Sequence, residues 1–101
     1  MRHTRRKRDA NHDEVADVWR RTGWTVLDTS AVGSNAYAGF SDLVCIRWPV
    51  MLFVEIKAGK AKLTQAEWEF RELVGSPPYV ICHSADEAVE QSREWRWANG
   101  T

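Results

Sequence analysis

The 101-residue sequence predicts an α/β domain in which a mixed four-stranded sheet is flanked by helices, in the order αβββαβα. Three stretches with helix-like spacing of apolar residues each follow a capping signal. Four short apolar runs rich in strand formers lie between and beside them. The length suits one small domain with a single core, and no segment reads as a linker that would divide it.

The helices are placed by capping boxes, in which Asn, Thr or Ser is followed three residues later by Glu. These boxes begin at Asn11, Thr64 and Ser84. Gly23 and Gly75 suit the C′ position, where a helix ends. The predicted helices cover about residues 12–22, 64–74 and 84–97.

The strands are delimited by Gly and Pro. The predicted strands cover residues 24–28, 41–48, 51–57 and 79–82. A two-residue turn at Pro49–Val50 would return the third strand antiparallel to the second, so that Val44 would face Glu55. The helix between the last two strands predicts a right-handed parallel crossover, which places the third strand inside the sheet.

Charge is unevenly distributed along the chain, although the formal net charge is zero. Basic residues are concentrated near the N-terminus, at Arg2, Arg5, Arg6, Lys7 and Arg8. From Asp9 onward the chain carries nine basic and fourteen acidic residues. We therefore expect a flexible basic arm over residues 1–10 and one domain over residues 11–101. Such an arm fits contact with DNA phosphates, and a solubilising tail is the alternative.

The sequence does not indicate a membrane or secreted protein. No apolar run approaches the roughly 20 residues of a membrane span, because charges interrupt each run. The basic N-terminus has no apolar segment behind it, so it does not read as a secretory signal. Cys45 and Cys82 fall in apolar runs, which predicts two buried free thiols and a cytoplasmic protein.

The segment FVEIKAGKAKLTQAEWEF, residues 53–70, carries Glu55 and Lys57 inside an apolar strand. Alternation along a strand puts both side chains on one face, roughly 7 Å apart. Asp42 begins the preceding strand, and the turn described above would place it opposite Lys57. The sequence therefore predicts two carboxylates and an ammonium group near the C-terminal end of a central strand, where α/β proteins tend to form sites.

Two neighbouring carboxylates repel each other unless a cation lies between them, and hard oxygen ligands suit Mg²⁺ or Mn²⁺. Such an ion polarises a phosphate and helps to ionise water, while a nearby ammonium group stabilises the charge that builds up. The pattern thus outlines a nuclease site. A Glu-x-Lys triplet is common by chance, and a solvated ion pair on an exposed strand is the alternative.

Two motifs, GFSDLVCI and FVEIKAGKAKLTQAEWEF, follow an acid-bearing first helix. Together they resemble the PD-(D/E)xK nuclease superfamily, and most of all its VRR-NUC branch in the stand-alone phage and bacterial form. The resemblance covers about residues 12–92. It implies a restriction-endonuclease-like fold in which Asp42 and Glu55 are metal ligands and Lys57 is the catalytic lysine. It also implies that the carbonyl of Ile56 completes the metal's protein ligands.

By the same resemblance, Gln65 is the family's glutamine and Glu14 is the acid that often joins the site. From the residues alone, a solvent-facing position at the start of a helix also explains Gln65, and a capping role explains Glu14. Lys60 and Lys62 follow the site and either grip DNA phosphates or form a solvated loop. Ser41 stands where the family usually has Pro, which puts the rigidity of this loop in doubt.

Tryptophan is abundant, with six residues in the chain. Trp19 and Trp68 lie on apolar helix stripes and are predicted to be core residues. Three others are harder to bury in so small a body, and exposed aromatics mark partner surfaces: Trp48, Trp95 and Trp97. We expect a homodimer, in agreement with the resemblance. The histidines show no ligand-like spacing and are interpreted as non-catalytic: His3, His12 and His83.

These observations lead to the hypothesis of a Mg²⁺- or Mn²⁺-dependent DNA endonuclease that hydrolyses phosphodiesters. The resemblance adds a preference for branched or structured DNA, such as four-way junctions, and a place in the cytoplasm of a bacterium or phage-infected cell, in DNA repair, recombination or replication. A catalytically inactive DNA-binding or scaffold module on the same fold is the first alternative. A small protein-interaction domain is the second, and it would leave the carboxylate pair without a purpose.

Overall fold

The computed structural model of the protein describes residues 11–29, 37–75 and 77–98. Its elements are α1 (His12–Arg21), β1 (Thr25–Asp28), β2 (Leu43–Arg47), β3 (Val50–Ile56), α2 (Gln65–Val74), β4 (Tyr79–Cys82) and α3 (Ala85–Ala98). This is the predicted order αβββαβα. Within the described ranges, none of the helices is both long enough and apolar enough to cross a lipid bilayer.

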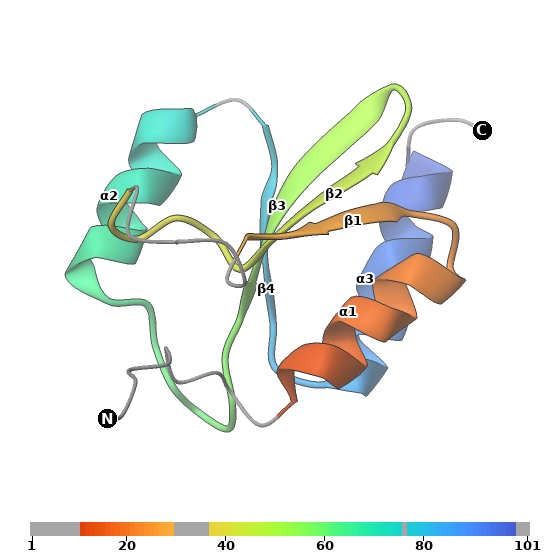
Figure 1. Cartoon of the computed structure of the whole chain (residues 1–101), viewed down its shortest axis with the longest axis horizontal. Coiled ribbons are helices and arrows are strands. Elements are labelled where there is room, and N and C mark those ends of the chain that lie inside the picture. Colours follow the sequence, from red (N-terminus) through yellow and green to blue (C-terminus); the bar gives the residue numbers. More distant parts are fainter. Residues whose placement is uncertain (1–10, 30–36, 76, 99–101) are drawn as a thin grey trace, which may run out of the picture.

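The four strands form one mixed sheet in the order β1-β2-β3-β4. β1 pairs with β2 and β2 with β3 in antiparallel fashion, whereas β3 and β4 are parallel. The predicted hairpin, parallel pair and interior position of β3 are therefore confirmed. Helices α1 and α3 lie together on one face of the sheet and α2 lies on the other (Figure 1).

The predicted register between the second and third strands is wrong by two residues. Arg47 pairs with Val50, so Trp48 and Pro49 form the turn in place of Pro49 and Val50. Val44 consequently faces Phe53 and not Glu55. Pro49, which has no N–H for the ladder, lies in the turn in either register, and the difference is that Val50 begins the strand while Trp48 enters the turn. A shift of two keeps every side chain on its face.

The larger core lies between the sheet and helices α1 and α3. It includes the inward side chains of β3 at Leu52, Val54 and Ile56, all of which are buried. Trp19 of α1 is buried as predicted, and its ring meets the ring of Trp24 edge-on with 5.3 Å between centroids. This apolar layer fixes which face of β3 is left for polar side chains.

Both cysteines are buried and free, as predicted. Burial raises the pKa of the thiols of Cys45 and Cys82 to about 12. The prediction for Trp68 is wrong, because 48% of this residue is exposed and the Arg71 guanidinium lies over its ring. Within α2 only Phe70 is buried, so the helix contacts the sheet through a narrower stripe than its sequence suggested.

Phe70 anchors α2 on the second face of the sheet, where it packs with Val44 and Phe53. The loop before β2 crosses the first turn of this helix at Gly39, which has a φ of +82°. A Cβ atom at Gly39 would lie 2.2 Å from the carbonyl oxygen of Ala66. Only glycine allows this crossing, which sets the path of the chain into β2.

The capping predictions have different outcomes. Thr64 and Glu67 form the complete capping box of α2. Ser84 accepts a hydrogen bond from the Glu87 N–H as predicted, whereas the Glu87 carboxylate accepts from the N–H of His83. The Asn11 box is wrong, because the Asn11 side-chain amide donates to the carbonyl of His83 at 2.8 Å. Asn11 therefore ties the start of α1 to the end of β4.

Candidate functional site

A group of ionisable side chains gathers at the C-terminal end of β3, on the face that α2 covers. Glu55 lies on this face with only 3% of its surface exposed. The Nζ atom of Lys57 lies 3.7 Å from Oε2 of Glu55 and 2.7 Å from Oε1 of Glu67. The predicted placement of Glu55 and Lys57 together on one face of the central strand is thus confirmed.

Asp42, the residue that precedes β2, also belongs to this group. Because Leu43 pairs with Val54, continuing the ladder by one residue places Asp42 beside Glu55. This corrects the predicted pairing of Asp42 with Lys57. Oδ2 of Asp42 accepts a hydrogen bond from the N–H of Ile56 at 2.8 Å. The carboxylate is therefore held at the open end of the β2–β3 pair.

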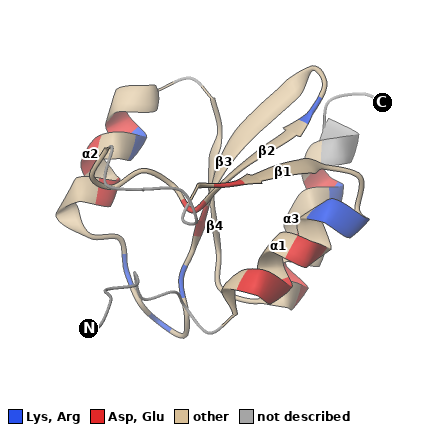
Figure 2. Cartoon of the chain, in the orientation of Figure 1, with Lys and Arg blue, Asp and Glu red and all other residues tan. Residues whose placement is uncertain are grey.

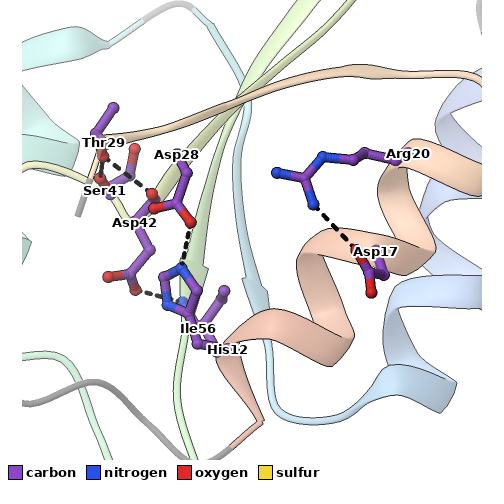
Figure 3. A network of polar contacts seen from close by, with 8 residues as sticks. All are labelled: His12, Asp17, Arg20, Asp28, Thr29, Ser41, Asp42 and Ile56. Atoms are coloured by element: carbon purple, nitrogen blue, oxygen red, sulfur yellow. Dashed lines mark hydrogen bonds and ion pairs between the residues drawn. The ribbon is translucent and has the colours of Figure 1, made fainter. Parts of the chain in front are cut away.

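The backbone around Asp42 is held by hydroxyl groups. The Thr29 N–H donates to the carbonyl of Asp42 at 3.0 Å, and the Thr29 hydroxyl donates to the carbonyls of Ser41 and Asp42. The buried Ser41 hydroxyl donates to the carbonyl of Leu43 at 3.0 Å. Figure 3 shows Thr29, Ser41 and Asp42 within this network. These bonds fix the backbone of Ser41 and Asp42 at the entry to β2.

Glu67 also belongs to this group. From the sequence, Glu67 was predicted only to cap a helix. Its Oε1 atom accepts a hydrogen bond from the N–H of Thr64 at 2.9 Å and also lies 2.7 Å from Nζ of Lys57. The capping box therefore aims this carboxylate at the strand. The four side chains of Asp42, Glu55, Lys57 and Glu67 together form the Glu55 cluster.

The Glu55 cluster contains three carboxyl groups and one ammonium group. Burial, followed by the negative charges of Asp42 and Glu67, raises the pKa of Glu55 far above its ordinary value. Burial also acts to raise the pKa of Glu67, but hydrogen bonds from Lys57 and the Thr64 backbone outweigh it and lower that pKa. Lys57 thus stabilises the negative charge of Glu67 more than that of Glu55. Glu55 therefore remains buried beside two other carboxylates.

Tyr79 of β4 closes the side of the Glu55 cluster. Its hydroxyl donates to Oε1 of Glu55 across 3.5 Å, a long hydrogen bond. Burial and the neighbouring carboxylates of Glu55, Glu67 and Asp42 raise the pKa of the Tyr79 hydroxyl. Tyr79 therefore stays a neutral donor toward Glu55, and its part in the site was not evident from the sequence.

The other side chains predicted for the site within the described ranges are exposed. The exposed side chain of Gln65 donates to Oε2 of Glu69 at 3.1 Å, one turn along α2. Glu14 is exposed on α1, whereas His12, two positions earlier, is buried. Lys60 and Lys62 are exposed in the segment after β3, where basic residues gather (Figure 2).

Some predictions fall outside the described residues. These are the arm residues Arg5, Arg6, Lys7 and Arg8, and the side chain of Trp97. Trp48 is 89% exposed at the β2–β3 turn, and Trp95 is partly buried against the larger core. The homodimer and the metal role of the Ile56 carbonyl stay predictions.

A second group of ionisable side chains lies near Asp42, where the start of α1 meets the end of β1 (Figure 3). Nε2 of His12 lies 3.0 Å from Oδ2 of Asp28, the last residue of β1. Asp13 completes the group, since one potential ligand atom from each of the three residues lies within 4.8 Å of the others. Figure 3 shows His12 and Asp28 beside Asp42 and Ile56. The sequence did not indicate this group, because the helix and strand that supply it meet only in the folded chain.

Comparison of this chain with family models, with curated proteins and with solved structures finds no match. The candidate site is therefore interpreted from its own chemistry. Oxygen donors, a neighbouring ammonium group and burial can together bind a divalent cation and stabilise charge on a phosphate.

Proposed function

We propose that this protein is a Mg²⁺- or Mn²⁺-dependent DNA endonuclease that hydrolyses phosphodiester bonds. The observation that carries the proposal is the Glu55 cluster itself. It places the carboxylates of Asp42 and Glu55 at neighbouring positions on adjacent strands, with the Lys57 ammonium group on the same face. The resemblance to VRR-NUC domains adds the preference for branched DNA, such as four-way junctions.

The donor set of the cluster fits a hard divalent cation. Glu55 is buried, and its raised pKa reflects burial and nearby negative charge that one ammonium group does not offset. A cation bound by Asp42 and Glu55 would relieve both effects, and carboxylate oxygens are the ligands that Mg²⁺ and Mn²⁺ prefer. By the resemblance, the Ile56 carbonyl would be a third ligand. A bound ion would supply Lewis-acid polarisation of the phosphate and help to ionise a water molecule.

Lys57 has the role of stabilising negative charge on the phosphate. Its ammonium group is held at 2.7 Å by Glu67, whose own position is fixed by the capping box of α2. A fixed ammonium group in a largely buried setting stabilises a transition state better than a mobile one in water. Lys60, Lys62 and the basic arm would contact the phosphates that flank the cleaved bond.

A catalytically inactive DNA-binding or scaffold module is the second candidate. Two observations favour it. The Lys57 ammonium group already forms a close ion pair with Glu67, and the side chain of Gln65 bonds to Glu69. A cluster that neutralises itself in this way could serve to join α2 to the sheet.

Cleavage assays separate the two candidates. Purified protein is incubated with labelled linear, flap and four-way DNA in Mg²⁺ or Mn²⁺, with EDTA as the blank. Asp42→Asn and Lys57→Ala should each lower the cleavage rate on the order of a hundredfold or more while DNA binding persists. Arg93→Ala, which removes an exposed basic residue from α3 on the opposite face of the sheet (Figure 1), is the control and should leave the cleavage rate unchanged.

The outcomes are distinct. Binding of DNA without cleavage of any substrate by the wild-type protein would support the inactive module. Cleavage by Asp42→Asn or Lys57→Ala at the wild-type rate would show that the roles given to these residues are wrong.

A further inference from the structure

We propose that His12, Asp13 and Asp28 form a binding site for Zn²⁺ that is separate from the Glu55 cluster and steadies the backbone beside it. His12 and Asp13 are the first two residues of α1, and Asp28 is the last residue of β1. The site would join the start of the helix to the end of the edge strand. The proposal concerns these three side chains and does not depend on nuclease activity.

The distances between the donors suit one ion. Nε2 of His12 lies 3.0 Å from Oδ2 of Asp28, and each of the three residues offers a ligand atom within 4.8 Å of the others. Ligands bound to one Zn²⁺ at about 2.0–2.2 Å are roughly 3–4 Å apart. Small side-chain rotations would therefore complete the coordination, with the ion replacing the hydrogen bond between His12 and Asp28.

The site is built on backbone that the fold already holds in place. His12 is only 2% exposed, so packing restricts its ring. Asn11 bonds to the carbonyl of His83, and Thr29 bonds to the carbonyl of Asp42. Neighbours of all three proposed ligands are thus fixed before an ion binds. Asp13 is exposed and Asp28 is partly exposed, which gives an ion a route from solvent.

The chemistry of the donors distinguishes this site from the Glu55 cluster. An imidazole nitrogen with two carboxylates suits Zn²⁺, with the fourth position left for water. The carboxylates of the Glu55 cluster offer only oxygen and suit Mg²⁺ or Mn²⁺. The two groups should therefore take different metals from a mixture.

Binding of Zn²⁺ would also influence the position of Asp42. Thr29 follows Asp28 directly and holds the backbone of Asp42 through its N–H and hydroxyl. In Figure 3 the side chains of His12, Asp28 and Asp42 lie next to one another. An ion on Asp28 would stiffen this junction, so the three ligands would act as positioning residues for the segment that carries Asp42.

The test measures Zn²⁺ binding by calorimetry in the full-length variant Asp42→Asn/Glu55→Gln, which lacks the two charged carboxylate ligands of the other site. We expect one Zn²⁺ per chain in the presence of excess Mg²⁺. Adding Asp13→Asn or Asp28→Asn should weaken binding at least about tenfold. Both changes keep the size of the side chain, and because Asp13 is exposed, its replacement leaves the packed core unchanged.

Matched controls identify the ligands. Asp17→Asn removes an exposed carboxylate from the same helix, and His3→Gln and His83→Gln remove the other histidines. These variants should bind Zn²⁺ as the parent variant does. With Co²⁺ as the probe, the visible spectrum of the bound ion should differ between the parent variant and Asp13→Asn, and it should be the same in the parent variant and Asp17→Asn.

The proposal is overturned by any of three results. The first is no Zn²⁺ binding at micromolar concentration by the parent variant. The second is binding that neither Asp13→Asn nor Asp28→Asn weakens. The third is binding that disappears in His83→Gln, which would place the ion at the His83–Glu87 pair.

Discussion

Replacing Glu55 with glutamine should stabilise the metal-free protein at neutral pH. Burial and the charges of Asp42 and Glu67 raise the pKa of Glu55 above the value of 4.5 expected for the unfolded chain. Folding therefore takes up a proton at any pH between the two pKa values. The contribution of Glu55 to stability is greatest below the unfolded pKa and declines as the pH rises toward the folded pKa. Glutamine resembles the protonated carboxyl group and stays neutral, so the stability of Glu55→Gln does not decline in this way as the pH rises.

The magnitude follows from the linkage between proton binding and folding. Each pH unit in the window costs the wild-type protein about 1.4 kcal/mol of unfolding free energy. Neutral pH lies between two and three units above the unfolded pKa, which sets an upper limit of about 4 kcal/mol. The attraction of Lys57 is already contained in the raised pKa of Glu55, and a glutamine amide replaces the protonated carboxyl group imperfectly, so we expect Glu55→Gln to gain about 1–3 kcal/mol near neutral pH. Near the unfolded pKa the two proteins should be about equally stable.

Urea unfolding monitored by tryptophan fluorescence, in EDTA, at about pH 5 and about pH 7.5 measures this difference. Glu72→Gln, an exposed change on α2, is the control and should leave the pH dependence unaltered. Addition of Mn²⁺ should then stabilise the wild-type protein and not Glu55→Gln, because the ion binds only to the intact carboxylates. If Glu55→Gln is clearly less stable than the wild-type protein near neutral pH without metal, the ionisation of Glu55 does not cost the folded protein stability and the prediction is wrong.

Two further predictions concern the fold. Gly39→Ala should lower the unfolding free energy by at least about 2 kcal/mol, because the added Cβ atom meets the backbone of α2 at a positive φ. Urea unfolding measures this loss, and an unchanged midpoint would contradict the close crossing. Trp19→Ala should cost about 3–5 kcal/mol and the exposed Trp68→Ala less than about 1 kcal/mol, by the same measurement. Equal costs would show that the assignment of Trp19 to the core and Trp68 to the surface is wrong.

Much of the fold could be predicted because its signals are local. The capping box at Thr64 and Glu67 and the glycine at position 75 place α2 within one residue of its observed bounds. Strand alternation places Glu55 and Lys57 on one face, whatever the register of the hairpin. The two-residue error at Pro49 left Asp42 on the correct side of the sheet because side chains repeat every second position.

The remainder depends on contacts between distant segments. Glu67 satisfies its capping role and also reaches Lys57, and only the packing of α2 on the sheet reveals the second contact. His12 and Asp28 are separated by most of α1 and all of β1, so their spacing carries no ligand signal. Asn11 has the residue type of a helix cap but forms its bond with His83, far along the chain.

Anomalous diffraction from crystals grown with Mn²⁺ tests the proposed metal site, because it locates the ion among the side chains. We expect a peak about 2.0–2.3 Å from carboxylate oxygens of both Asp42 and Glu55, next to the Lys57 ammonium group. A second crystal with Zn²⁺ should add a peak at His12, Asp13 and Asp28. Absence of a Mn²⁺ peak from Asp42 and Glu55 in the crystals grown with Mn²⁺ would contradict the proposed metal-dependent nuclease.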